Sequence, residues 1–154
     1  KQFFMIKRTK KISTKKEYLY DNIKFDSSLE IYCYKALKKV NILFNYTPIT
    51  YTLVPASKFI GISYESDKRT GKYLVPKSNN LQSIKYTPDF VGDGWFIETK
   101  GNQTDVFNMR FKLFKKYLTD NLVDCLLFMP KNHLQVDQAI ELILKQERDD
   151  YTNI

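Results

Sequence analysis

Three polar side chains, Asp89, Glu98 and Lys100, are spaced so that a β-hairpin would gather them. Between the two acids lies Asp93-Gly94, a dipeptide that favours a two-residue hairpin turn. With these two residues as the loop, Asp89 faces Glu98 across the strand pair. Lys100 falls on the same face, because side chains alternate along a strand. The pattern therefore predicts two carboxylates and an ammonium group on one face of a hairpin whose reverse face is apolar.

Facing carboxylates repel each other unless something positive lies between them. Two hard carboxylates, a backbone carbonyl and water molecules suit Mg²⁺, and Thr99 is the candidate for the backbone ligand. Lys100 could then stabilise charge that develops on a phosphate. In an alternative interpretation, Asp89 and Glu98 form a solvated strand face with Lys100 as ion-pair partner. If the hairpin loop is longer than two residues, Asp89 and Glu98 no longer face each other directly.

Glu30 has two interpretations. Ser27-Ser28-Leu29-Glu30 matches the capping box, in which the glutamate reaches back to the start of a helix. Glu30 also borders the apolar stripe of that helix, where it could turn inward and bind a metal. We favour the ligand and keep the cap as the alternative.

These residues resemble the PD-(D/E)xK nuclease superfamily. The similarity is greatest to the phage endonuclease I family of Holliday-junction resolvases and covers about residues 20–130. It rests on Thr87-Pro88-Asp89-Phe90, on Trp95-Phe96-Ile97-Glu98-Thr99-Lys100-Gly101 and on Ser28-Leu29-Glu30.

The resemblance implies a restriction-endonuclease-like α/β core with a mixed sheet flanked by helices. By it, Asp89, Glu98 and Glu30 would bind Mg²⁺, with Mn²⁺ able to substitute, and Lys100 would be the catalytic lysine. It further implies a homodimer that cleaves branched DNA to leave a 5′-phosphate, in the host cytoplasm if the chain is phage-encoded. One departure is that residues 56–85 form a longer segment than in those resolvases, which puts subunit swapping and junction specificity in doubt.

The net charge of +8 is concentrated near the N-terminus, since residues 1–16 hold seven basic residues and no acid. A basic arm suits phosphate-backbone binding, although a solvated tail is the alternative. A second basic cluster lies in residues 100–116, where Arg110 could equally contact phosphate or solvent. The candidate nucleic-acid ligands are Lys7, Arg8, Lys10, Lys11, Lys15, Lys16, Arg110, Lys112, Lys115 and Lys116.

Length and composition predict one globular domain over residues 17–154, preceded by the arm at 1–16. The longest apolar stretch is too short to span a membrane, and residues 1–11 lack the apolar core of a secretory signal. Two isolated cysteines and a single histidine support neither disulfides nor zinc. We therefore expect a soluble cytoplasmic protein. Hydrophobic periodicity predicts helices at about 27–40, 107–118 and 136–144, and strands near 44–53, 86–101 and 123–129. The strand at 123–129 should be buried on both faces, a hairpin should flank a solvated tip at 67–71, and His133 should lie in a loop.

Together these features predict a Mg²⁺-dependent DNA endonuclease. One alternative is a nuclease or nickase for linear duplex, favoured if the hairpin around residues 57–76 contacts bases. The other is a noncatalytic nucleic-acid-binding or virion protein with the same fold.

Overall fold

The computed structural model describes residues 18–47, 49–101 and 104–152, and side chains as far as residue 146. The helices are α1 (Ser28–Lys39), α2 (Asp105–Asp120) and α3 (His133–Thr152). The strands are β1 (Tyr18–Tyr20), β2 (Ile23–Phe25), β3 (Asn45–Tyr46), β4 (Tyr51–Val54), β5 (Ser57–Lys58), β6 (Tyr64–Ser66), β7 (Leu74–Pro76), β8 (Asn80–Leu81), β9 (Ile84–Tyr86), β10 (Phe90–Gly92), β11 (Trp95–Ile97) and β12 (Leu126–Phe128). None of the helices in this part of the chain is both long and apolar enough to cross a membrane.

A mixed four-stranded sheet in the order β12-β11-β10-β3 forms the centre of the described fold. β12 runs parallel to β11, and the other neighbours are antiparallel. Phe90, Trp95 and Ile97 project from one face into a core shared with α1 and α3. Phe96, from the other face, packs against α2. The protein is thus a mixed α/β fold with helices on both sides of its sheet, as the sequence predicts.

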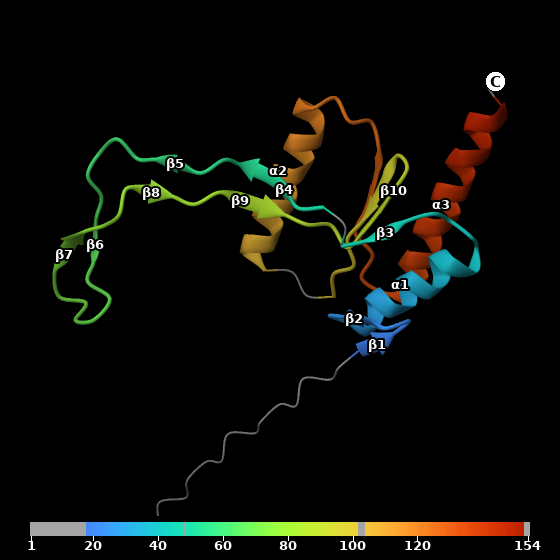
Figure 1. The fold of residues 1–154 in the computed structure, drawn as a ribbon, viewed down its shortest axis with the longest axis horizontal. Coiled ribbons are helices and arrows are strands. Elements are labelled where there is room, and N and C mark those ends of the chain that lie inside the picture. The colour runs from blue at the N-terminus through green and yellow to red at the C-terminus, as the bar shows by residue number, and fades with distance from the viewer. Residues whose placement is uncertain (1–17, 48, 102–103, 153–154) are drawn as a thin grey trace, which may run out of the picture.

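Strands β4 to β9 build a two-stranded ribbon, which we define as residues 51–86. Its base, β4 paired with β9, packs on α2 through an aromatic cluster that contains Tyr51 and Tyr86. The outer ribbon, residues 55–83, continues through the β5–β8 and β6–β7 pairs and projects away from the sheet and helices (Figure 1). The predicted hairpin is therefore present, but it belongs to a much longer arm.

The helix predictions hold within a few residues at most ends. Ser27 caps α1, its side chain accepting a hydrogen bond from the backbone N–H of Glu30, and Thr104 caps α2 in the same way through Phe107. The predicted last helix was too short, because α3 starts at His133 and continues to Thr152. His133 is therefore not in a loop, and its ring stacks on that of Tyr32 with centroids 3.9 Å apart.

The strand predicted at 123–129 was too long and too deeply placed. β12 covers only Leu126–Phe128, all three residues are half-buried, and the strand lies at the edge of the sheet. The sequence analysis also missed the β1–β2 hairpin. Its turn, Asp21-Asn22, has positive φ at both residues, as a type I′ turn requires.

Candidate metal and nucleic-acid site

The β10–β11 hairpin has the predicted register. Phe90 pairs with Ile97, and Gly94 takes the left-handed conformation at the turn with φ of 71°. Asp89 and Glu98 are the next residues outward on the two strands, so they face each other just beyond the last ladder pair. The core on both sides of the sheet fixes this register, because a one-residue slip would move every side chain of the strand to the opposite face, where the packing does not fit it.

Each acid has one oxygen held by a neighbouring donor. Asp89 Oδ2 accepts hydrogen bonds from the backbone N–H and the hydroxyl of Thr99, both at 2.7 Å. Glu98 Oε2 accepts one from the hydroxyl of Tyr86, at 2.9 Å. Thr99 thus orients Asp89, in addition to its predicted role as a backbone ligand. Tyr86 comes from the base of the ribbon, so the ribbon and the acid pair share a contact.

Both acids hold their protons more tightly than ordinary carboxyl groups do. Burial raises the pKa of Asp89 to about 6; the negative charge of Glu30 adds to this, and the Thr99 hydrogen bonds oppose it. Burial, followed by the negative charge of Asp89, raises the pKa of Glu98 to about 7, against the opposing Tyr86 hydrogen bond. The site therefore favours one proton, or another cation, shared between the two carboxylates.

Lys100 lies close enough to lower the pKa of both acids. Among the described residues, however, no ion pair joins it to either one, so the ion-pair alternative is not seen. Its backbone N–H donates to the carbonyl of Pro130, at 3.1 Å, and its Nζ lies 5.0 Å from the ring centroid of Phe107 on α2. The ammonium group is thus held near the acids without neutralising them.

Glu30 caps α1. Its Oε1 accepts from the hydroxyl of Ser27 at 2.8 Å, and its Oε2 accepts from the backbone N–H of Asp26 at 3.0 Å and the hydroxyl of Tyr46 at 2.7 Å. The side chain is only 6% exposed. Its charge nevertheless raises the pKa of Asp89, so it lies near the pair. Glu30 thus supports the cap through the hydroxyl of Ser27 and the N–H of Asp26, one residue before the N-cap amide that the capping box predicts, and its ligand role stays a prediction.

Two tyrosines at the site were missed by the sequence analysis. Tyr46 donates to Glu30 and Tyr86 donates to Glu98, and burial followed by the adjacent carboxylate raises the pKa of each phenol. The sequence could have indicated that Tyr86 belongs to the site, since it starts the Tyr-Thr-Pro-Asp run that ends at Asp89. Tyr46 lies sixteen residues from Glu30, and no sequence pattern indicated that the two residues meet.

The described residues contain no group of three or more His, Cys, Asp or Glu side chains arranged to hold a metal ion. Asp89 and Glu98 face each other, and Glu30 lies near them but is held at the start of α1 by its own hydrogen bonds. The chemistry of this pair fits a hard divalent cation, because two buried carboxylates with raised pKa values lack an ion-paired cation among the described side chains.

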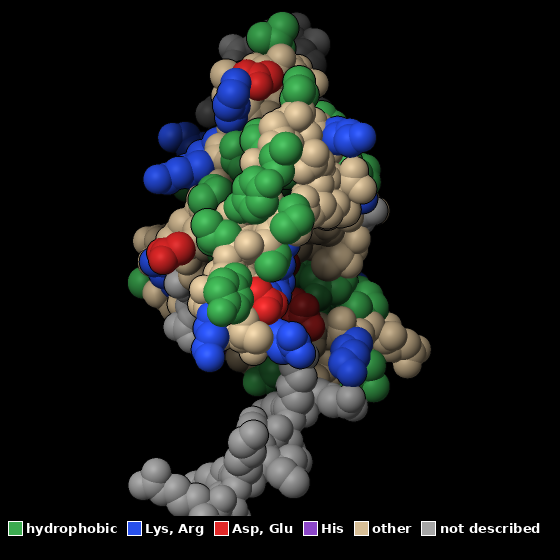
Figure 2. All heavy atoms as spheres, turned by 90° about the vertical axis from the view of Figure 1, so that its left-hand side faces the viewer, with side chains coloured by type: hydrophobic (Ala, Val, Ile, Leu, Met, Phe, Trp, Pro, Cys, Tyr) green, Lys and Arg blue, Asp and Glu red, His purple; other side chains and the backbone are tan. Residues whose placement is uncertain are grey.

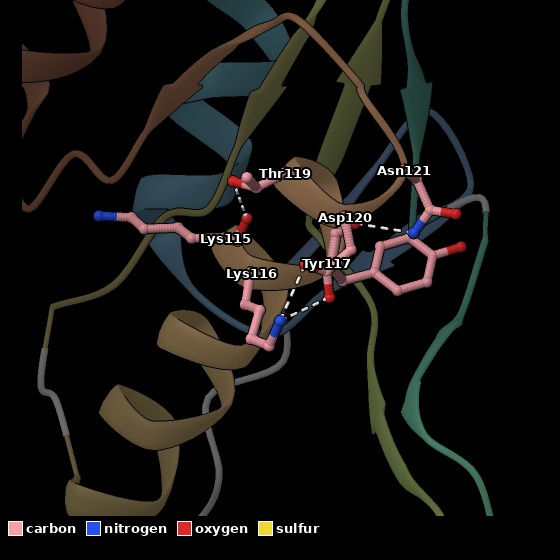
Figure 3. Close-up of polar contacts among 6 residues, drawn as sticks. All are labelled: Lys115, Lys116, Tyr117, Thr119, Asp120 and Asn121. Atoms are coloured by element: carbon pink, nitrogen blue, oxygen red, sulfur yellow. Dashed lines mark hydrogen bonds and ion pairs between the residues drawn. The ribbon is translucent and has the colours of Figure 1, made fainter.

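The predicted basic ligands fall into two groups. Lys7, Arg8, Lys10, Lys11, Lys15 and Lys16 lie outside the described residues. Arg110, Lys112, Lys115 and Lys116 are exposed on α2. Lys116 forms an ion pair with Asp120 at 2.8 Å, whereas Lys115 extends away from that pair (Figure 3) and lies 5.0 Å from the ring centroid of Phe111. One of the four cations on α2 is therefore already neutralised.

The chain was compared with family models, curated proteins and solved structures. No curated protein and no solved structure matches it. A family model does match residues 8–129, which include Glu30, Asp89, Glu98, Lys100 and the whole ribbon. The chain therefore belongs to the family described as Protein of unknown function (DUF1064).

Proposed function

We propose that the protein is a Mg²⁺-dependent endodeoxyribonuclease that hydrolyses phosphodiester bonds of branched DNA and acts as a homodimer. The observation that carries the proposal is the buried pair of Asp89 and Glu98 at the end of the β10–β11 hairpin. Their pKa values are raised, and Lys100 lies nearby without an ion pair. A structural salt bridge would place the lysine on an acid, whereas this arrangement leaves the pair available to a cation.

Each residue of the proposed site would have a distinct role. Asp89 and Glu98 would hold the cation, Thr99 and Tyr86 keep one oxygen of each acid in place, and Lys100 would contact the phosphate. A bound divalent cation activates water for attack on phosphorus and neutralises phosphate oxygens. The position of Lys100, held over Phe107 and not on an acid, leaves its charge for the substrate.

The exposed cations of α2 support a nucleic-acid substrate. Phe107, over which Lys100 lies, belongs to the same helix as Arg110, Lys112 and Lys115. A DNA backbone held along α2 would therefore pass close to the acids. Branched DNA is recognised through the shape of its backbone, and phosphate contacts of this kind provide that without a base-reading helix.

The metal half of the proposal is tested by titrating Mn²⁺ into the protein in a calorimeter. We expect binding by the wild type, and its loss in Asp89→Asn and Glu98→Gln, which keep the hydrogen bonds but remove the charge. Asp93→Asn is the matched control, because it removes an acid of the same hairpin at the exposed turn. Uptake by Asp89→Asn equal to that of the wild type would contradict the proposed site.

The catalytic half is tested by offering a four-way junction, a flap, a linear duplex and a single strand with Mg²⁺. We expect cleavage of the junction by the wild type and by Asp93→Asn, and loss of cleavage in Asp89→Asn and Lys100→Ala. Cleavage confined to linear duplex would reject the branched-DNA proposal. DNA binding without any cleavage would identify a noncatalytic binding protein.

Glu30 needs its own experiment, because it is both a cap and a candidate ligand. Glu30→Gln keeps one acceptor oxygen for the N–H of Asp26 and the hydroxyl of Tyr46, and its amide group can donate to the hydroxyl of Ser27, but it loses the charge. If Glu30 binds the cation, this variant should bind Mn²⁺ more weakly than the wild type. If its affinity is unchanged, the residue is a cap alone.

A further inference from the structure

The outer ribbon lacks the layers that cover the rest of the strands. Among the described residues, large apolar or aromatic side chains on it are widely exposed, with Ile60 99% and Tyr73 72% exposed. Figure 2 looks at the molecule from the ribbon's side and shows hydrophobic side chains down the middle of this face, with Lys and Arg at its margins. A two-stranded ribbon is at best marginally stable alone in water, so an arm of this kind suits a partner that covers it.

The charge of the outer ribbon indicates the kind of partner. Residues 55–83 hold five basic residues, Lys58, Lys68, Arg69, Lys72 and Lys77, against the two acids Glu65 and Asp67. Within the described part of the chain, no ion pair neutralises any of these five cations. The surface therefore complements a polyanion.

The ribbon tip, residues 66–73, concentrates this charge. Its one acid, Asp67, is used in the turn, where its carboxylate accepts from the backbone N–H of Arg69 at 3.0 Å and the hydroxyl of Thr70 at 2.8 Å. These hydrogen bonds, the one from Arg69 first, hold the pKa of Asp67 below its usual range. Lys68, Arg69 and Lys72 are all exposed around it. The turn thus presents three cations together on a fixed loop.

We infer that the ribbon is a DNA-binding arm and that its tip grips the backbone and groove of duplex DNA beyond the candidate site. The inference rests on the proposed function, because it assigns part of the substrate contact to this arm. A two-stranded ribbon is narrow enough to enter the major groove of B-DNA. The exposed Ile60 and Tyr73 would contact sugars along the groove, while the cations contact phosphates, so the arm would hold duplex without reading its bases.

The placement of the ribbon fits this role. Its inner end, Tyr86, donates to Glu98, so the arm starts at the acid pair. Fifteen residues separate Gly71 at the tip from Tyr86, and at about 3.3 Å per residue the strand spans up to about 50 Å. One turn of duplex is about 34 Å long. The tip can therefore reach DNA a full helical turn away from a bond held at Asp89 and Glu98.

A second copy of the chain is the competing occupant, since exposed apolar side chains also suit self-association. A two-fold dimer through the tips would bring identical surfaces together. Each tip contributes Lys68, Arg69 and Lys72, with its acid used internally, so such a contact would place like charges side by side. The charge distribution therefore favours DNA over self-association.

The test measures affinity for a labelled 30-base-pair duplex by fluorescence anisotropy, without Mg²⁺, between 50 and 200 mM salt. The test variant combines Lys68→Gln, Arg69→Gln and Lys72→Gln. The logarithm of the affinity falls linearly with the logarithm of the salt concentration, and each phosphate contact contributes about 0.9 to this slope. If the variant loses three contacts, the factor by which its affinity falls between 50 and 200 mM salt should be about 40 times smaller than the factor for the wild type. The matched control removes the same charge from the exposed side chains of α1 and α3 with Lys35→Gln, Lys39→Gln and Lys145→Gln, and should stay near the wild-type slope.

Equal slopes for the tip variant and the control would overturn the inference. So would a dimer in sedimentation that Ile62→Asp separates while duplex affinity is unchanged, because the ribbon would then belong to a second copy. Thermal unfolding checks that both triple variants stay folded. The two proposals fail separately: Mn²⁺ uptake reports on the acid pair alone, and the salt slope reports on the tip alone.

Discussion

Two hairpins of this chain use similar local chemistry and end in opposite environments. β10–β11 turns at Asp93-Gly94, the outer ribbon turns at residues 67–71, and Gly94 and Gly71 both have φ near 70°. The first hairpin is packed on both faces by helices and aromatic side chains. Among the described residues, no helix or second sheet covers either face of the outer ribbon beyond its base. Packing, and not turn chemistry, therefore fixes the geometry of the acid pair. The outer ribbon is held by the hydrogen bonds between its two strands.

The largest expected effect on stability comes from replacing an isoleucine in each of the two hairpins. Ile97 is fully buried in β11, and Ile60 in the outer ribbon is 99% exposed. Ile97→Ala should lower the free energy of unfolding by about 2–5 kcal/mol, because it leaves a cavity in the core. Ile60→Ala should change it by less than about 0.5 kcal/mol. Urea unfolding measures both, and equal losses would break the comparison.

Gly92 gives the next largest effect, because the ring of Trp95 lies against it. A Cβ at Gly92 would overlap Cε2 of Trp95, a residue that is itself buried. Gly92→Ala should therefore displace the ring and destabilise the fold by about 1–3 kcal/mol. Since the chain has one tryptophan, a red shift of its fluorescence reports the displacement directly.

Gly101→Ala is the control for Gly92. No atom lies within 4 Å of a Cβ at Gly101, and its φ is outside the strained positive range. Emission and stability close to wild type are expected for it. A Gly92→Ala protein with unshifted emission would show that the hairpin tolerates movement of its core face.

The acid pair gives the hairpin a dependence on pH opposite in sign to that of the ribbon tip, where hydrogen bonds lower the pKa of Asp67. The folded-state pKa values of Asp89 and Glu98 are raised to about 6 and about 7, above about 4 in the unfolded chain. The folded protein therefore binds more protons than the unfolded one between about pH 4 and 7. The contribution of the pair to stability is greatest on the acid side and is lost as pH rises through that window.

Asp89→Asn tests this sign. It retains an acceptor for Thr99 and removes the buried charge, so at pH 8 it should be more stable than the wild type by about 1–2 kcal/mol. At pH 4 the two proteins should be nearly equal. Thermal unfolding across the range provides the measurement, and a variant less stable than the wild type at pH 8 would mean that the pair is already neutralised within the fold.

The sequence predicts the register of the acids well because Asp93-Gly94 and the alternation around it are local signals. The contacts of the acids were harder to foresee, since Tyr86 and Tyr46 reach Glu98 and Glu30 only after the sheet and α1 have assembled. The central sheet, the first helix and the aromatic face of α2 follow from periodicity for the same local reason.

The errors have physical causes as well. An apolar run cannot distinguish a central strand from an edge strand, so β12 was expected to be buried on both faces. Within the outer ribbon, Phe59 to Tyr64 has the composition of a buried strand, yet Ile60 and Ile62 are exposed. Composition predicts burial only when a covering layer exists, and no layer of the described fold covers this arm.

The smallest expected effect comes from replacing one turn glycine in each hairpin with alanine. The two replacements distinguish local opening of a turn from unfolding of the whole protein. Gly94 and Gly71 have φ of 71° and 65°, and a Cβ at either meets no atom within 4 Å. Alanine at each position therefore adds only the strain of the left-handed conformation, about 1 kcal/mol. In the buried hairpin the turn and the core unfold together, so Gly94→Ala should lower the global free energy of unfolding by that amount.

In the ribbon the tip can open alone, because no helix or sheet of the described fold packs on it. Gly71→Ala should therefore leave global unfolding within about 0.5 kcal/mol of the wild type and speed hydrogen exchange at the tip. The informative amides there are those of Asp67 and Gly71, which donate to the carbonyls of Tyr73 and Asp67. Equal global losses in the two alanine variants would mean that the ribbon unfolds with the body as one unit. Its stability would then depend on the same core that fixes the acid pair.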